Sequence, residues 1–108
     1  MAQLAIKGND KKSKDILALF EMLGGKNNCG LKETVSCFYY YMISDNTVVL
    51  NTPDSNEVQN SARMTIEEFE KEYPYKVGDK VTISYEGLPY TTTIDSVRWS
   101  IKNECVLY

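Results

Sequence analysis

The chain has 108 residues and a formal net charge of −3 at pH 7, so it can bury one modest hydrophobic core and no second one. Hydrophobic residues make up 43% and charged residues 25%, which excludes wholesale disorder and predicts a single domain over residues 1–108. The negative charge argues against broad binding to a nucleic-acid backbone, because such binding needs a basic surface.

Histidine is absent, which removes the commonest general base and the commonest zinc ligand. The three cysteines, Cys29, Cys37 and Cys105, are widely spaced and form no Cys-x-x-Cys pair, so no zinc site is predicted. We expect free thiols in a reducing cytoplasm and no cofactor. No run approaches the ~20 apolar residues of a membrane span, so we expect a cytoplasmic protein that binds no membrane.

The N-terminal part, residues 1–35, predicts a strand and a helix. A short strand is expected from Leu4 to Ile6, followed by a basic loop. Ser13, or alternatively Asp10, is expected to cap a helix that ends at Gly24. The helix carries an apolar stripe formed by Ile16, Leu19, Phe20, Met22 and Leu23.

Residues 36–51 predict a tyrosine-rich β-hairpin. Val35 to Ile43 is rich in β-branched and aromatic residues, Asp45-Asn46 can turn the chain, and Thr47 to Leu50 can return as the partner strand. Alternate positions place apolar side chains on both faces of the first strand. We therefore expect a helix on one face and a second copy of the chain on the other, which predicts a homo-oligomer.

Residues 51–63 predict an irregular polar segment, and a short helix is expected within residues 64–73. Thr65-x-x-Glu68 is a capping box, in which each side chain accepts a hydrogen bond from the other residue's backbone N–H. The helix from Ile66 to Glu72 should stop before Pro74, because the residue before proline avoids the α region.

Residues 77–108 predict a β-meander. Val81, Ile83 and Tyr85 alternate with polar residues, which indicates a half-buried strand. We expect a turn at 87–89, a bulged strand from Tyr90 to Trp99, a turn at 100–103 and a final strand at 104–108. The predicted fold is α+β, with a helix packed on a small antiparallel sheet and a C-terminal SH3-like β-meander.

Three segments carry a resemblance to a known group of proteins. They are Ile16 to Asn28 (Ile-Leu-Ala-Leu-Phe-Glu-Met-Leu-Gly-Gly-Lys-Asn-Asn), Thr65 to Lys71 (Thr-Ile-Glu-Glu-Phe-Glu-Lys) and Tyr73 to Val81 (Tyr-Pro-Tyr-Lys-Val-Gly-Asp-Lys-Val). The chain resembles small proteins encoded by phages and prophages of gut bacteria. The resemblance implies a phage protein acting in the bacterial cytoplasm, and it brings no catalytic signature. Members often carry Gly-His and Thr-Arg-Gly before the first helix, whereas this chain has Gly8-Asn9 and lysines there.

The basic loop is a candidate anion site. Lys7, Lys11, Lys12 and Lys14 lie close to the expected helix N-terminus, where backbone N–H groups favour anions, and Gly8 allows close backbone approach. Arg98 is a further candidate for contact with a phosphate. The alternative is a solvated lysine loop and an outward-facing arginine.

Tyr39, Tyr41 and Trp99 are candidates for stacking on a base. The same residue types are also used in small β-rich cores and in subunit interfaces. The pattern alone leaves both interpretations open.

No catalytic residues are predicted, because the chain has no identifiable nucleophile, paired carboxylates or metal-ligand spacing. We expect a non-enzymatic phage accessory protein that binds and sequesters a host nucleotide immune signal. The alternative is a protein-interaction module that inhibits a host protein. A third interpretation, a nucleic-acid-binding SH3-like module, is disfavoured by the net charge.

Overall fold

The centre of the protein is a four-stranded sheet in a computed structural model that describes residues 2–27 and 37–108. Its strands are β1 (Leu4–Lys7), β2 (Tyr39–Met42), β3 (Val48–Asn51) and β4 (Ala62–Met64), in the spatial order β3-β2-β1-β4. β1 pairs antiparallel with β2 and parallel with β4. The α+β class is confirmed, but the sheet is mixed and not purely antiparallel as predicted. The predictions for residues 28–36 lie outside the described residues.

Helix α1 (Ser13–Met22) forms where the apolar stripe predicts it, and Ile16, Leu19 and Phe20 are buried. The predicted cap is wrong: Ser13 is the first helical residue, and Lys12 takes the N-cap position without a side-chain hydrogen bond. The helix ends at Met22 with Leu23 as its C-cap, and Gly24 follows with φ +91°, a conformation that costs glycine little.

The hairpin of β2 and β3 turns where predicted. Asn46 has φ +65°, and a carboxylate oxygen of Asp45 accepts a hydrogen bond from the backbone N–H of Thr47 at 3.0 Å. Tyr40 and Met42 belong to the main core, whereas Tyr39 and Tyr41 point to the other face of the sheet and form a smaller cluster with Ala5 and Val58.

A short helix, α2 (Asn56–Gln59), covers this second face. Ser55 caps it by accepting a hydrogen bond from the backbone N–H of Val58, which is fully buried. The predicted irregular segment, residues 51–63, is therefore wrong, because it contains α2 and the first two residues of β4. Tyr40 and Tyr41 are buried within one chain, so this strand no longer requires a second copy to cover it.

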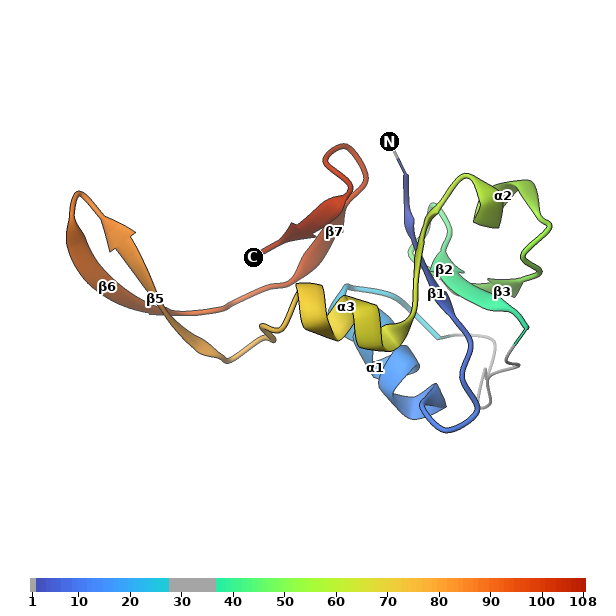
Figure 1. Cartoon of the computed structure of the whole chain (residues 1–108), viewed down its shortest axis with the longest axis horizontal. Coiled ribbons are helices and arrows are strands. Elements are labelled where there is room, and N and C mark those ends of the chain that lie inside the picture. The colour runs from blue at the N-terminus through green and yellow to red at the C-terminus, as the bar shows by residue number, and fades with distance from the viewer. Residues whose placement is uncertain (1, 28–36) are drawn as a thin grey trace.

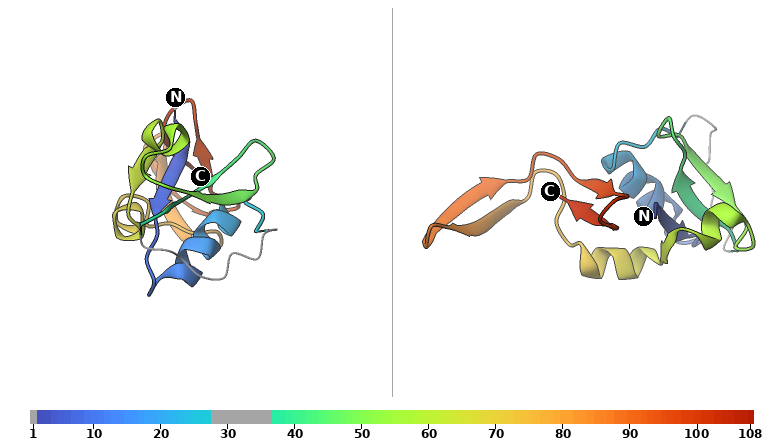
Figure 2. Two further views of the ribbon diagram at one scale, coloured as in Figure 1. Left: turned by 90° about the vertical axis from the view of Figure 1, so that its right-hand side faces the viewer. Right: turned by 90° about the horizontal axis from the view of Figure 1, so that it is seen from above.

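Helix α3 (Ile66–Glu72) has the predicted bounds, and the predicted capping box is confirmed. The Thr65 hydroxyl accepts from the Glu68 N–H, and the Glu68 carboxylate accepts from the Thr65 N–H, both at 3.1 Å. Ile66 and Phe69 enter the same core as α1. Figures 1 and 2 show α1 and α3 lying on one side of the central sheet.

The C-terminal third forms two separate two-stranded sheets. β5 (Lys80–Tyr85) pairs with β6 (Leu88–Thr93), and β7 (Arg98–Ser100) pairs with β8 (Cys105–Leu107). The predicted strand from Tyr90 to Trp99 is wrong, because residues 94–97 form an irregular link between the two sheets. The SH3-like meander is not confirmed.

We call residues 80–93, the hairpin of β5 and β6, the arm. It projects from the rest of the molecule (Figure 1), which measures 48 × 27 × 24 Å. Its turn lies at Glu86 (φ +52°) and Gly87 (φ +79°), the pair of positive angles that a type I′ hairpin turn requires. The predicted turn at 87–89 is therefore displaced, since Leu88 and Pro89 belong to β6.

Within the described part of the chain, no helix is long and apolar enough to cross a membrane.

Candidate functional site

The basic loop lines a hollow of about 410 Å³ between β1 and the start of α3. Asn9 shapes the loop: its side-chain oxygen accepts from the Lys11 N–H at 3.0 Å, and its carbonyl oxygen accepts from the Lys12 N–H at 3.1 Å. Gly8 is buried, and its N–H donates to the Phe38 carbonyl at 2.7 Å. The hollow brings together three of the predicted site residues, and it is lined by Lys7, Gly8, Asn9, Asp10, Lys11, Thr65 and Glu67.

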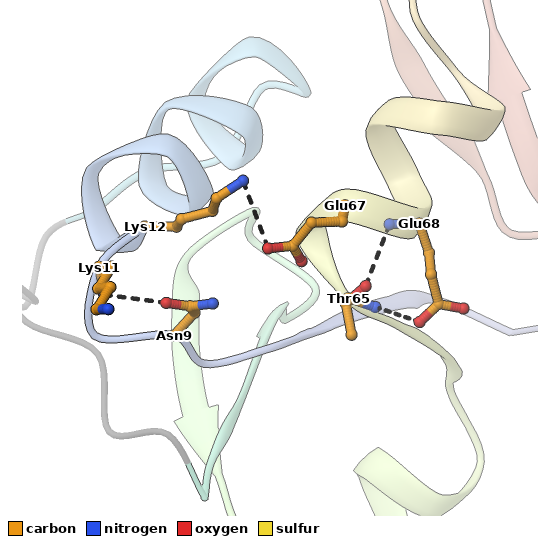
Figure 3. Close-up of polar contacts among 6 residues, drawn as sticks. All are labelled: Asn9, Lys11, Lys12, Thr65, Glu67 and Glu68. Carbon is orange, nitrogen blue, oxygen red and sulfur yellow. Dashed lines mark hydrogen bonds and ion pairs between the residues drawn. The ribbon is translucent and has the colours of Figure 1, made fainter.

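Acidic side chains partly neutralise this hollow. The Lys12 ammonium lies 3.4 Å from a carboxylate oxygen of Glu67, as Figure 3 shows. A hydrogen bond from the backbone of Glu67 and the nearby Lys12 lower the pKa of the Glu67 carboxyl below its ordinary value. Lys14 is exposed on α1 and does not line the hollow. The loop therefore presents mixed charge.

The predicted stacking tyrosines belong to the smaller core cluster. Tyr41 is 4% exposed, and its hydroxyl accepts a hydrogen bond from the Asn51 side-chain amide at 3.2 Å. Tyr39 is half-buried against the same cluster. The ring of Tyr41 is therefore engaged in packing, and neither tyrosine lines the basic hollow.

Trp99 joins the C-terminal hairpin to the core. Its indole N–H donates to the Ala2 carbonyl at 2.9 Å, and its ring meets Tyr73 edge-on with ring centroids 6.2 Å apart. Arg98 is exposed beside it. Both residues line a separate hollow of about 330 Å³ with Leu23 and Met42. The predicted phosphate and stacking residues thus lie in three places and form no single pocket.

The arm exposes the apolar side of β5, which the alternation of residues 81–85 predicted to be buried. Its register pairs Val81 with Thr92, Ile83 with Tyr90 and Tyr85 with Leu88. Because side chains alternate across a strand, these six share one face, and polar residues dominate the other. Tyr85 and Leu88 are each 69% exposed, Tyr90 is 60% exposed and Ile83 47%. We call the six side chains the apolar face.

The apolar face continues into a groove of about 520 Å³ at the base of the arm. Tyr75 and Tyr108 both line the groove, with their rings edge-on and 5.7 Å apart. Partial burial raises the pKa of the Tyr108 hydroxyl above its ordinary value. The groove is lined by Tyr75, Val81, Thr82, Ile83, Thr92, Thr93, Ile94, Asp95, Ser96 and Tyr108.

The base of the arm is fixed to the core. The Gly78 N–H donates to the Ile94 carbonyl at 2.8 Å, and the Ile94 N–H donates to the Asp79 carbonyl at 2.9 Å. Ile94 and Val97 are buried in the main core. The glycine has φ +92° in a turn that the N–H of Asp79 closes on the Lys76 carbonyl at 3.0 Å. The apolar face is therefore held outward by an anchored hairpin.

The alternation of residues 81–85 correctly predicts which side chains of β5 share a face. It does not predict that the apolar face is exposed to solvent. The signal that was missed is the Glu86-Gly87 pair, which fits the two-residue turn of a tight β-hairpin and predicts two paired strands of equal length. The described residues contain no cluster of three or more metal-ligating side chains, and Cys37 and Cys105 are free thiols.

The chain was compared with protein-family models, with curated proteins and with solved structures, and none of them matches it.

Proposed function

We propose that this chain is a non-catalytic protein-interaction module whose contact surface is the apolar face of the arm. The observation that carries the proposal is the exposure of Ile83, Tyr85, Leu88 and Tyr90 on one side of an anchored hairpin. Exposed apolar patches of this kind mark interaction sites on soluble proteins, and tyrosine is enriched in such interfaces. The resemblance to phage-encoded proteins supports a protein of the bacterial host as the partner.

The test compares two variants of the arm, one altered on the apolar face and the other altered on the opposite face. Ile83→Thr with Tyr90→Thr removes the centre of the apolar face and keeps residues that favour strands. Ser84→Ala with Thr91→Ser, the control variant, alters the opposite face at two exposed positions that do not line the groove. We expect the wild type and the control variant to capture the same stoichiometric protein from host lysate, and the threonine variant to lose it. Equal capture by all three proteins would contradict the proposal.

A second candidate function is binding of a small nucleotide ligand in the hollow of the basic loop. The observation in its favour is that Lys7, Lys11 and the buried Gly8 line one hollow of about 410 Å³. Glu67 and Asp10 line the same hollow and oppose an anion. Saturating cyclic nucleotides and ADP-ribose should raise the melting temperature of the wild type, and Lys7→Ala with Lys11→Ala should abolish the increase. An unchanged wild-type melting temperature would reject this function.

A further inference from the structure

The apolar face has no charged side chain, so two copies of it can meet without electrostatic repulsion. Val81, Ile83, Tyr85, Leu88, Tyr90 and Thr92 are all uncharged. In a two-fold symmetric dimer, the patch of one copy packs against the same patch of the other copy. A patch with charges of one sign would therefore be repelled by its counterpart. The tyrosine hydroxyls supply polar groups that can pair at the rim.

The two strands of the arm have equal length, so the two ends of the apolar face lie at similar distances from its centre. β5 and β6 each span six residues, and the pair Ile83–Tyr90 lies at the centre of their register. In an antiparallel arrangement about that centre, the Tyr85–Leu88 end of one copy meets the Val81–Thr92 end of the other. The groove of about 520 Å³ opens at this second end. It offers a place for the tip side chains of the other copy.

The exposed area reaches the size of a small specific interface. The tyrosines at 69% and 60% exposure and their aliphatic neighbours present on the order of 400–500 Å² per copy. Covering both copies buries about 800–1,000 Å², and the upper end of this range meets the lower limit of about 1,000 Å² for a specific association. This area predicts a reversible dimer.

The arm also gains stability from such a partner. A two-stranded hairpin alone is marginally stable in water, because it lacks a third strand or a packed face. Every residue from Thr82 to Thr91 is exposed, so the outer arm receives little support from its own chain. A second arm packed against the apolar face supplies the missing layer.

We propose that two copies of this chain associate through their arms, with the apolar faces packed antiparallel about the Ile83–Tyr90 centre. This inference rests on the proposed function, since a second copy of the chain binds the same apolar face. A different protein partner then binds in competition with self-association, and the dimer protects the apolar face until that partner is present.

The first experiment measures molar mass by size-exclusion chromatography with light scattering over a concentration series. One chain has a mass of 12.3 kDa. We expect the wild type and the Ser84→Ala, Thr91→Ser control to approach twice that mass as concentration rises. Ile83→Thr with Tyr90→Thr should stay at the mass of one chain. A monomeric wild type at the highest concentration, or a dimer that survives the threonine changes, overturns the inference.

The second experiment fixes the geometry by oxidative crosslinking. Tyr90→Cys places a thiol at the centre of the proposed contact, and Thr91→Cys places one on the opposite face of the same strand. Both variants retain the native cysteines, so the background reaction is matched. We expect a covalent dimer from Tyr90→Cys in clear excess over Thr91→Cys, and equal yields contradict the packing.

The two proposals fail separately. A monomeric wild type that still captures a host protein through the apolar face overturns the dimer and supports the interaction module. A dimer whose arm variants capture the same host protein as the wild type supports the dimer and overturns the module.

Discussion

The indole N–H of Trp99 donates a hydrogen bond to the carbonyl oxygen of Ala2 at 2.9 Å, which ties β7 to the residues that precede β1. The ring of Trp99 also meets Tyr73, which in turn packs against Phe69 with ring centroids 5.1 Å apart. The C-terminal hairpin is therefore attached to both the first strand and α3. This attachment orients the link that carries the arm.

Replacing Trp99 with phenylalanine should lower the free energy of unfolding by about 1 kcal/mol, because the hydrogen bond to Ala2 is lost while much of the ring contact remains. Urea titration followed by circular dichroism measures the change, because the substitution removes the only tryptophan of the sequence. Ser84→Ala is the control, since Ser84 is exposed on the opposite face of the arm, and it should leave the midpoint unchanged. Equal stability of Trp99→Phe and the wild type would show that the bond contributes nothing.

Alanine should be far less tolerated at Gly25 than at Gly24. A Cβ atom on Gly25 would lie 2.8 Å from the Phe20 carbonyl oxygen and 2.9 Å from the Met42 sulfur. This overpacking should cost about 2–3 kcal/mol. At Gly24 a Cβ atom meets open space, and only the φ of +91° costs free energy, about 1 kcal/mol. Thermal unfolding of both variants checks the order, and the reverse order would contradict the packing described at Gly25.

The sequence predicts the fold well where local signals are strong. The bounds of α3 follow from Thr65, Glu68 and Pro74, since these residues begin and end a helix through their own backbone hydrogen bonds and sterics. The missed strand β4 has no comparable local signal. Its residues become a strand only through parallel pairing with β1, which lies far away in the sequence.

Loss of the α3 cap is expected to be a local and moderate effect. Thr65→Ala removes the acceptor for the Glu68 N–H and should lower the free energy of unfolding by about 1 kcal/mol. Glu68→Gln keeps an oxygen that can accept from the Thr65 N–H, so it should cost less. Chemical denaturation of the two variants and of Ser84→Ala, an exposed control, measures the difference. A Glu68→Gln variant less stable than Thr65→Ala would be inconsistent with a capping box.

The contact of Glu67 with Lys12 predicts a pH-dependent stability difference. The backbone hydrogen bond and Lys12 lower the pKa of Glu67 in the folded state, so its contribution is fully present above the ordinary value of 4.5 and is lost as the pH falls through the lower folded value. The melting temperature of Glu67→Gln should lie slightly below that of the wild type at neutral pH. The difference should vanish at the acidic end of a pH series. A gap that widens as the pH falls would refute this assignment.

The candidate surface was harder to predict than the fold. The alternation of Val81, Ile83 and Tyr85 gives the same pattern whether the apolar side is covered by the chain's own core or left exposed, because periodicity reports faces and not neighbours. The residues of the basic loop and the tyrosines each lie on the elements expected of them. Their distance from one another follows from the order β3-β2-β1-β4, which no local pattern encodes.

The central position of β1 has a consequence for the order in which the chain acquires its structure. β1 leaves the ribosome before both strands that flank it, because Tyr40, beside Ile6 on one edge, and Met64, beside Ile6 on the other, are synthesised much later. Closing such long loops is slow compared with forming a hairpin whose partners are adjacent. The arm needs only residues 80–93 to close and can form within microseconds of their synthesis. β1 must therefore wait for its partners, whereas the two strands of the arm lie next to each other in the sequence and can pair early.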